Sequence, residues 1–169
     1  MPVIRSAGIE DAAPIGRIKV RSWTSAYAEF MPASLLGALD PDQEAADWAA
    51  YVTAIPDGHR LWVADVDGAV VGFCRTGPAV DDPDLGPHAG EVYGLYVDPD
   101  HVGAGLGRLL FGHAVADLRA RGHRPAYVYA YQPNVGAIRF YQRAGFALDG
   151  TTRLDDEIGV VELRLVDGR

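Results

Sequence analysis

The spacing of apolar and polar residues along the chain changes several times between strand-like runs and helix-like periodicity. Short apolar runs predict strands over residues 3–7, 60–66, 69–76, 91–97, 126–131 and 157–166, with amphipathic helices between them. The predicted order is strand, two helices, three strands, helix, strand, helix, and a final strand or strands. Residues 80–90 are polar and rich in proline, which predicts a loop. Because no linker or repeat interrupts this order, we expect one mixed α/β domain over residues 1–169.

Local signals support several element boundaries. The first helix should run from about residue 11 to residue 30. The second should begin at an N-cap, Asp40, followed by Pro41 at the first helical position and by Gln43, whose position is typical of a capping box. The Asp67-Gly68 pair between two apolar runs predicts a β-hairpin with a two-residue turn.

Composition excludes several functional classes. The chain has a formal net charge of −8, which argues against a nucleic-acid partner and against binding to an anionic membrane, although it leaves a cationic small substrate open. The single cysteine, Cys74, excludes an internal disulfide, and its apolar neighbours predict a buried strand residue. The N-terminus shows no apolar leader, and no stretch approaches the ~18 apolar residues of a membrane span. We therefore expect a cytoplasmic protein.

Three glycines at alternate positions, Gly103, Gly105 and Gly107, open the helix that ends at Gly122. Each costs a helix roughly 1 kcal/mol relative to alanine, so the pattern needs an explanation beyond packing. The first N–H groups of a helix bind anions, and glycine lets a phosphate approach the backbone. The spacing fits neither the dinucleotide motif G-x-G-x-x-G nor a P-loop. The segment therefore predicts an anion site of another type, with a tight turn as the structural alternative.

Two segments resemble motifs of the GNAT superfamily of N-acetyltransferases. LYVDPDHVGAGLGRLL is similar to its acyl-CoA-binding signature, in which a strand leads to Q/R-x-x-G-x-G/A at a helix start. NVGAIRFYQRAGF resembles the family's N-x-x-A-x-x-F-Y-x-x-x-G-F helix, and VRSWTSAY is similar to a subset of bacterial members. The resemblance implies an α/β (α+β) GNAT fold: a mixed, mostly antiparallel sheet of six to seven strands, splayed between strands 4 and 5 and flanked by about four helices. It implies transfer of the acetyl group of acetyl-CoA to a primary amine.

The resemblance also implies how acetyl-CoA is held. Backbone N–H groups of residues 102–107 bind the pyrophosphate, and the pantetheine arm pairs along residues 95–97, where an N–H polarises the thioester oxygen. Val102 stands where the family has Gln or Arg, so a side-chain contact is lost while the N–H is kept; Arg108 can add charge, or is simply a solvated helix residue. The predicted cofactor-binding residues are Leu95, Tyr96, Val97, Val102, Gly103, Ala104, Gly105, Leu106, Gly107, Arg108, Asn134 and Ala137. No metal is expected, because the five histidines lack metal-binding spacing.

Helical spacing predicts that Asn134, Ala137 and Tyr141 share one helix face, suited to the pantetheine arm. Phe140 and Ala144 should then point towards the core. A phenol stays protonated at pH 7, so Tyr141 can donate a proton to the departing thiolate. The resemblance assigns that role to the family's equivalent tyrosine, and a tyrosine that merely packs is the alternative.

Glu91 is the candidate base, because an amine of pKa ~10 must lose a proton before it attacks. Strand alternation places Glu91 on the same face as Tyr93, Leu95 and Val97. A surface glutamate at the end of a strand is the alternative.

The acceptor side is less defined. Trp23, Tyr27 and Tyr131 are candidate pocket residues, with core packing as the alternative for each. The acceptor can be a small-molecule amine, a peptide N-terminus or a lysine, and the sequence leaves a homodimer open. A second hypothesis is a catalytically silent acyl-CoA-binding or regulatory module on the same fold. A third, a nucleotide-phosphate enzyme, is disfavoured by the missing phosphate motifs.

Overall fold

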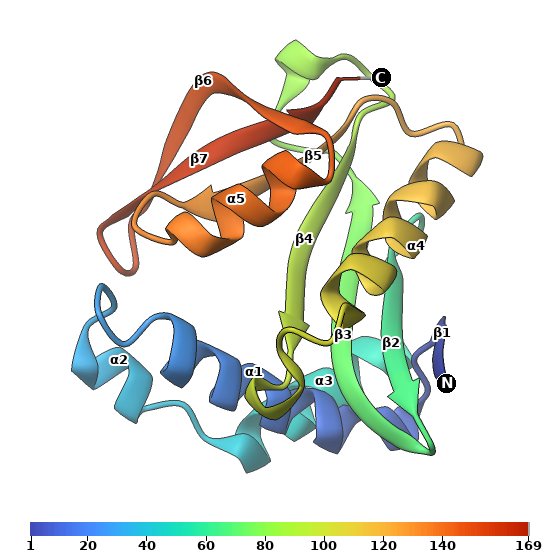
Figure 1. Ribbon diagram of the computed structural model, residues 1–169, viewed down its shortest axis with the longest axis vertical. Helices are drawn as coiled ribbons and strands as arrows, with labels where there is room; N and C mark the ends of the chain where they lie inside the picture. Colours follow the sequence, from blue (N-terminus) through green and yellow to red (C-terminus); the bar gives the residue numbers. More distant parts are fainter. Residues whose placement is uncertain (169) are drawn as a thin grey trace.

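The strands form a single seven-stranded sheet in the order β1-β2-β3-β4-β5-β7-β6, antiparallel except between β4 and β5 (Figure 1). The computed structural model describes residues 1–168. Its strands are β1 (Pro2–Ser6), β2 (Arg60–Val66), β3 (Ala69–Pro78), β4 (Gly90–Val97), β5 (Ala126–Tyr131), β6 (Phe146–Asp155) and β7 (Val160–Asp167). Its α-helices are α1 (Ala12–Ala26), α2 (Ala33–Gly37), α3 (Pro41–Thr53), α4 (Leu106–Ala120) and α5 (Val135–Arg143). The predicted mixed sheet is confirmed.

Two apolar clusters lie on opposite faces of this sheet. On one face, α4 and α5 bury residues such as Leu110 against Val92 of β4 and Val128 of β5. On the other, α1 and α3 pack over β2 and β3, with Ile15 against Phe73. We call these the α4 face and the α1 face. Burial on both faces explains why the central strands are apolar runs rather than clean alternations.

The sheet splays between β4 and β5. The two strands pair only where Gly90–Val92 lies beside Ala126–Val128, although β4 continues to Val97 and β5 to Tyr131. Figure 1 shows the two strands diverging from this short contact. The unpaired backbone N–H and C=O groups along both diverging edges need other partners. The splay between strands 4 and 5 is therefore confirmed, and it places free backbone groups inside the molecule.

A bulge in β4 changes which face its side chains occupy. The pairing of β3 with β4 slips by one residue, which leaves Tyr93 without a partner across the ladder. As a result Val92 lies on the α4 face together with Leu95 and Val97. Glu91, adjacent to Val92, therefore points to the α1 face. The prediction that Glu91 shares a face with Leu95 and Val97 was wrong, because simple alternation does not count the bulge.

The turn and cap signals were mostly correct. The Asp67-Gly68 turn has two residues with positive φ, 53° and 87°, as a two-residue hairpin requires. Asp40 caps α3 by accepting a hydrogen bond of 3.0 Å from the Asp42 N–H. The predicted capping box does not form, because the Gln43 side chain instead donates to Asp47 one helical turn ahead, at 2.9 Å.

Other boundaries differ from the prediction. The first helix ends at Ala26 rather than near residue 30, because residues 27–31 form turns. The short helix α2 was not predicted, and β6 was covered only by the prediction of a final strand or strands; β6 is a polar, largely exposed edge strand without an apolar signature. The predicted loop over residues 80–90 contains a 3-10 turn, and its Asp82 is buried. Within residues 1–168 no helix combines the length and apolar character needed to cross a membrane.

Candidate active site

The glycine-rich segment forms the N-terminus of α4. Gly103 and Gly105 have φ of +91° and +81°, a conformation that glycine adopts without steric cost, and Gly105 is the N-cap. No atom lies within 4 Å of a Cβ built on either residue, so backbone conformation rather than crowding requires glycine here. Val102, 70% exposed, precedes them in extended backbone. The start of this 15-residue helix is therefore open to an anion.

A cavity of about 430 Å³ extends from this segment to α5. Its walls come from the loop and α4, from β4, and from α5: His101, Val102, Gly103, Gly105, Gly107, Arg108, Leu95, Val97, Ala137, Phe140 and Tyr141. The structure thus brings together the two sequence motifs and most of the predicted cofactor-binding residues. Four predicted residues do not line this cavity, and one of them, Asn134, lies at the start of α5 and lines a neighbouring cavity instead. Ala104 is exposed, Leu106 is buried in the core, and Tyr96 packs against Phe73 on the α1 face.

The N-terminus of α5 differs from the prediction. Asn134 is the N-cap and not a helix residue, and its side-chain oxygen accepts a hydrogen bond of 3.3 Å from the Ala137 N–H. Its side-chain NH₂ group is left to donate to a ligand. Phe140 packs against the core, as expected, but it also lines the cavity, and Ala144, expected to point towards the core, is exposed at the C-cap of the helix. The expectation for Ala144 was wrong because α5 ends at Arg143, while Phe140 serves both the core and the cavity.

Tyr141 lies where two cavities meet. The second cavity, of about 120 Å³, occupies the splay between β4 and β5 and shares Leu95, Ala137 and Tyr141 with the larger one. The Tyr141 side chain is only 7% exposed, and burial raises the pKa of its phenol well above the ordinary value. The hydroxyl therefore stays protonated at neutral pH. A protonated phenol at the junction of two cavities can donate a proton to a group bound in either cavity.

Tyrosines dominate the splay cavity. Besides Tyr141 its walls include Glu162 of β7, Asn134, and five further tyrosines: Tyr27, Tyr93, Tyr96, Tyr129 and Tyr131. The predicted pocket aromatics do meet here. Tyr27 lies edge-on to Tyr131 with ring centroids 5.4 Å apart, and Trp23 packs behind Tyr27 at 5.3 Å. Phe30, which sequence reasoning missed, closes the same cluster.

Glu91 is buried on the α1 face, with 4% of its surface exposed. Burial raises the pKa of its carboxyl to about 7, although Arg153, 3.7 Å away, opposes the shift. The group therefore exchanges a proton near neutral pH, as a general base should. Glu91 does not line the splay cavity, so a proton from that cavity needs a relay to reach it.

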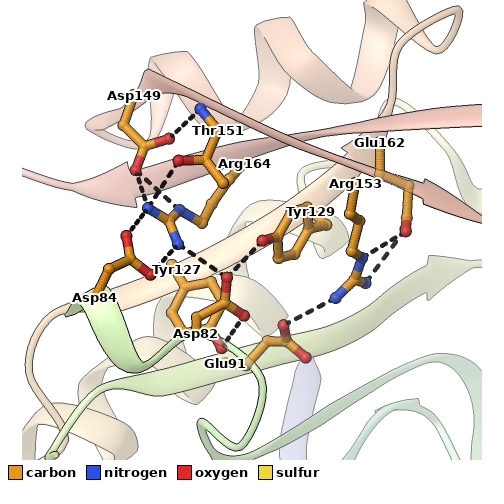
Figure 2. Close-up of polar contacts among 10 residues, drawn as sticks. All are labelled: Asp82, Asp84, Glu91, Tyr127, Tyr129, Asp149, Thr151, Arg153, Glu162 and Arg164. Atoms are coloured by element: carbon orange, nitrogen blue, oxygen red, sulfur yellow. Dashed lines mark hydrogen bonds and ion pairs between the residues drawn. The ribbon is translucent and has the colours of Figure 1, made fainter. Parts of the chain in front are cut away.

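Glu91 belongs to a polar network that sequence reasoning missed (Figure 2). Its centre is Arg164 of β7, 2% exposed, whose guanidinium bonds to Asp82 at 2.8 Å, to Asp84 at 2.6 Å and to Asp149 at 2.7 Å. The sequence signal was the Asp-Asp-Pro-Asp run in the loop over residues 80–90, which looked like ordinary loop polarity. The buried arginine fixes that loop against β7.

The outer part of the network connects β5 to β6 and β7. Tyr127 and Tyr129 both donate hydrogen bonds to Asp82, at 2.9 and 2.5 Å. The guanidinium of Arg153 lies 3.7 Å from the ring centre of Tyr129 and bonds to Glu162 at 2.6 Å. The alternate tyrosines of β5 thus all point to the α1 face, while the residues between them pack on the α4 face. Within residues 1–168 no group of three acidic, histidine or cysteine side chains is arranged to hold a metal ion.

Comparison with known proteins places this geometry in context. The model of the acetyltransferase (GNAT) family matches residues 20–146. A mycothiol acetyltransferase of Cellulomonas flavigena is 40% identical over 96 residues, which cover 54% of this chain but only 27% of that protein. The chain thus matches about a quarter of such relatives. An uncharacterized N-acetyltransferase of Bacillus subtilis, YuaI, is 28% identical over 143 residues, covering 84% of this chain and 78% of the relative.

Solved structures share the fold. PaiA N-acetyltransferase of Thermoplasma acidophilum, in complex with coenzyme A, superimposes with a TM-score of 0.76 at 16% identity, covering 97% of this chain and 98% of that one. The putative acetyltransferase yncA of Salmonella typhimurium, with acetyl-CoA, gives 0.70 at 21% identity and covers 98% and 92% of the two chains. At these identities the likeness shows the fold alone.

Proposed function

The chain belongs to the GNAT acetyltransferase family, and from this premise we propose that it transfers the acetyl group of acetyl-CoA to a primary amine by direct attack in a ternary complex. The observation that carries the proposal is the pair of cavities that meet at Tyr141. One begins at an open helix N-terminus, and the other opens among aromatic and acidic side chains. Holding two reactants in the reactive orientation can lower the activation free energy by ~7–11 kcal/mol. Two adjoining cavities that position both reactants therefore contribute to catalysis.

The cavity of about 430 Å³ that begins at the glycine-rich segment suits acetyl-CoA. Backbone N–H groups of residues 102–107 bind the pyrophosphate at the start of α4. Residues Leu95–Val97 continue β4 beyond its pairing with β5, so their backbone groups can pair with the amides of the pantetheine arm. The Val97 carbonyl is already occupied, because Ser22 Oγ donates to it at 3.1 Å. An N–H of this segment then polarises the thioester oxygen. The side-chain NH₂ group of Asn134 adds a donor from α5.

The groove between α4 and α5 suits the nucleotide end. Its volume is about 610 Å³, and it shares Arg108 and Phe140 with the 430 Å³ cavity that begins at the glycine-rich segment. Arg108 and Arg143 line it and are exposed, and neither has a carboxylate within 4.0 Å among residues 1–168. Two unpaired guanidinium groups beside an apolar wall fit a nucleotide that carries phosphates. Arg108 thereby replaces charge that Val102 cannot supply.

The splay cavity suits the amine and the proton transfers. Tyr141 donates a proton to the sulfur that leaves, because its raised pKa keeps the phenol protonated. Glu91, ionised in part near neutral pH, accepts the amine proton through a water relay. The acceptor is a small-molecule amine, a peptide N-terminus or a lysine side chain.

Two measurements on the intact chain test the proposal. Coenzyme A and acetyl-CoA should raise the melting temperature, because a ligand of the native state stabilises it by mass action. A free-thiol assay with acetyl-CoA and a panel of polyamines, amino acids, aminoglycosides and peptides should then find an acceptor. Stabilisation by ATP or NAD but not by coenzyme A would overturn the proposal. Stabilisation by coenzyme A without thiol release for any amine would favour the silent binding module instead.

A further inference from the structure

Arg153 of the edge strand β6 connects the proposed base to the wall of the splay cavity (Figure 2). Its Nε donates to Oε2 of Glu162 at 2.6 Å, and its Nη1 lies 3.7 Å from Oε1 of Glu91. Its guanidinium carbon also lies 3.7 Å from the ring centre of Tyr129. Glu162 and Tyr129 line the splay cavity, whereas Glu91 does not. One cation therefore contacts two residues of the cavity wall and also reaches the buried Glu91.

A cross-strand ion pair does not by itself account for this geometry. Arg153 and Glu162 lie directly opposite each other on β6 and β7, where a pair of opposite charges contributes little to stability. The contact with Glu91 is different, because β5 and β7 separate β4 from β6 in the sheet. The Arg153 side chain thus reaches across two strands. The Glu91 side chain is only 5% exposed, so solvent screens its attraction to Arg153 less than it screens a pair at the surface.

The charge environment of Glu91 makes Arg153 its main counterion. Among residues 1–168 Arg153 is the only cation within 4.0 Å of the Glu91 carboxylate. Burial is the largest cause of the raised pKa of Glu91, about 7, and Arg153 opposes it. The other titratable or charged groups around Glu91 come from neighbouring elements: Asp82 of the loop before β4 with its partner Arg164, Tyr127 of β5, Glu162 of β7, and Tyr93 of β4, whose ring contacts Arg75 of β3.

From this geometry we propose that Arg153 is a positioning residue for the acetyl transfer, which holds Glu91 in the ionised form that accepts the amine proton. The inference rests on the proposed function, in which Glu91 is the base. A cation beside a buried carboxyl group favours the carboxylate over the protonated form. Glu162 competes for the same guanidinium, so the bond between Arg153 and Glu162 limits how strongly Arg153 acts on Glu91. Arg153 acts through Glu91 and needs no contact with the reacting atoms.

The dependence of kcat/KM on pH tests this role in the free-thiol assay, once an acceptor amine has been found. In Arg153→Gln the low-pH limb should move to higher pH by about one pH unit, because a nearby opposite charge lowers the pKa of a carboxyl group by at least about that much. The rate at pH 7 should then fall by about fivefold and recover near pH 9, with KM for acetyl-CoA unchanged. Arg153→Lys keeps the charge and should return the limb most of the way to its wild-type position.

Glu162→Gln should move the same limb in the opposite direction. This change removes a like charge near Glu91 and frees Arg153 from its competing partner, so Glu91 should ionise at lower pH. Arg121→Gln is the matched control. Arg121 also pairs with a carboxylate, Asp117 at 2.9 Å, but it lies at the C-terminal end of α4, so its loss should leave the limb in place.

Two results would overturn the proposal. Arg153→Gln could lower the rate by one factor at every pH, or the limb could move to higher pH in Glu162→Gln as well as in Arg153→Gln. Either result would mean that Arg153 only packs between the strands. If Arg153→Gln does not fold, the position of the limb in Arg153→Lys and Glu162→Gln decides.

A titration without substrate separates this inference from the proposed activity. Carbon-13 NMR follows the side-chain carboxyl of Glu91, whose signal is identified by its loss in Glu91→Gln. The midpoint should rise in Arg153→Gln and fall in Glu162→Gln. These shifts in a protein that releases no thiol with any amine would support the control of Glu91 by Arg153, and only the proposed activity would fail. Thiol release together with one Glu91 midpoint in wild type and Arg153→Gln would support the activity and overturn this inference.

Discussion

The two faces of the sheet offer different kinds of binding surface. On the α4 face the cavity begins at glycines and the first N–H groups of α4 and continues between apolar residues, so much of its polarity comes from backbone, with Arg108, His101 and Tyr141 as its polar side chains. On the α1 face polarity comes from side chains: the tyrosines of β5, Glu91, and the buried Arg164 with its carboxylates. Recognition by backbone groups depends on chain conformation, so it tolerates a valine at position 102 where the family has Gln or Arg. Side-chain recognition depends on each residue and is suited to a ligand particular to this chain.

The faces also differ in how their parts are joined. The α4-face cavity comes from two compact motifs, residues 95–108 and 134–141. The α1-face network joins the loop before β4 to β5, β6 and β7, and its arginine lies 82 residues from its aspartate partner Asp82. The cofactor side should therefore resist single substitutions better than the acceptor side, in stability as well as in activity.

The strongest test of this difference is Arg164→Leu, which removes the centre of the α1-face network. Asp82 and Asp149 would lose their buried counterion, so the free energy of unfolding should fall by about 3–5 kcal/mol. Arg21→Leu is the control, since the Arg21 side chain is 47% exposed and solvent screens its pairs with Asp98 and Asp100, so the free energy of unfolding should change far less. Urea denaturation measures both. Equal losses in the two variants would contradict the contrast between the faces.

Tyr141→Phe tests the residue that lines both cavities. The variant keeps the ring that packs in the core and removes only the proton donor, so kcat should fall by ~100-fold while acetyl-CoA affinity holds. Single-turnover kinetics and calorimetry give the two values. A fall of less than about threefold, with chemistry shown to be rate-limiting, would reduce Tyr141 to a packing residue.

Glu91→Gln tests the base on the α1 face. The wild-type rate should rise with pH through about 7, because only the carboxylate accepts a proton, and the variant should lose this limb. We expect turnover to fall by roughly tenfold to a hundredfold, with little change in acetyl-CoA binding. An unchanged rate and pH profile would assign the proton to another route.

The same substitution has a stability consequence of known sign. The folded-state pKa of Glu91 is raised from 4.5 to about 7, so the native protein binds the proton more tightly than the unfolded chain does. Its contribution to stability is therefore complete below pH 4.5 and is lost as pH rises through 7. At ~1.4 kcal/mol per pKa unit the loss reaches about 3 kcal/mol. Denaturation of the glutamine variant at pH 5 and pH 8 should lack this difference.

The smallest expected effect is on the cofactor side. Gly105→Ala and Gly122→Ala each place a methyl group on a residue with positive φ, at opposite ends of α4, and should each cost about 1 kcal/mol of stability. Only Gly105→Ala should also weaken coenzyme A binding, by about tenfold, because its methyl group adjoins the predicted pyrophosphate site. Calorimetry with coenzyme A measures this. Equal affinities in the two variants would contradict a phosphate site at this helix start.

Much of the fold and of the cofactor side follows from the sequence alone. Gly103 and Gly105 have positive φ immediately before the first residue of α4, and glycine adopts this conformation without steric cost. The Asp67-Gly68 turn and the Asp40 cap are equally local. The spacing of Ala137 and Tyr141 was enough to place both beside the glycine segment once the family resemblance was seen. Such features depend on a few adjacent residues, so their physical causes can be recognised in the amino-acid sequence.

The acceptor side was decided by tertiary structure. One bulge at Tyr93 moved Glu91 to the face opposite Leu95, and no local pattern announces a slip in a ladder formed with another strand. Asp82 looked like a loop residue until β7 brought Arg164 to it. Arg75 looked like any strand arginine until two tyrosines from α3 and β4 enclosed it. Burial and ion pairing depend on contacts between residues far apart in the sequence. The pKa and the binding role of a charged side chain therefore depend on neighbours that only the folded structure provides.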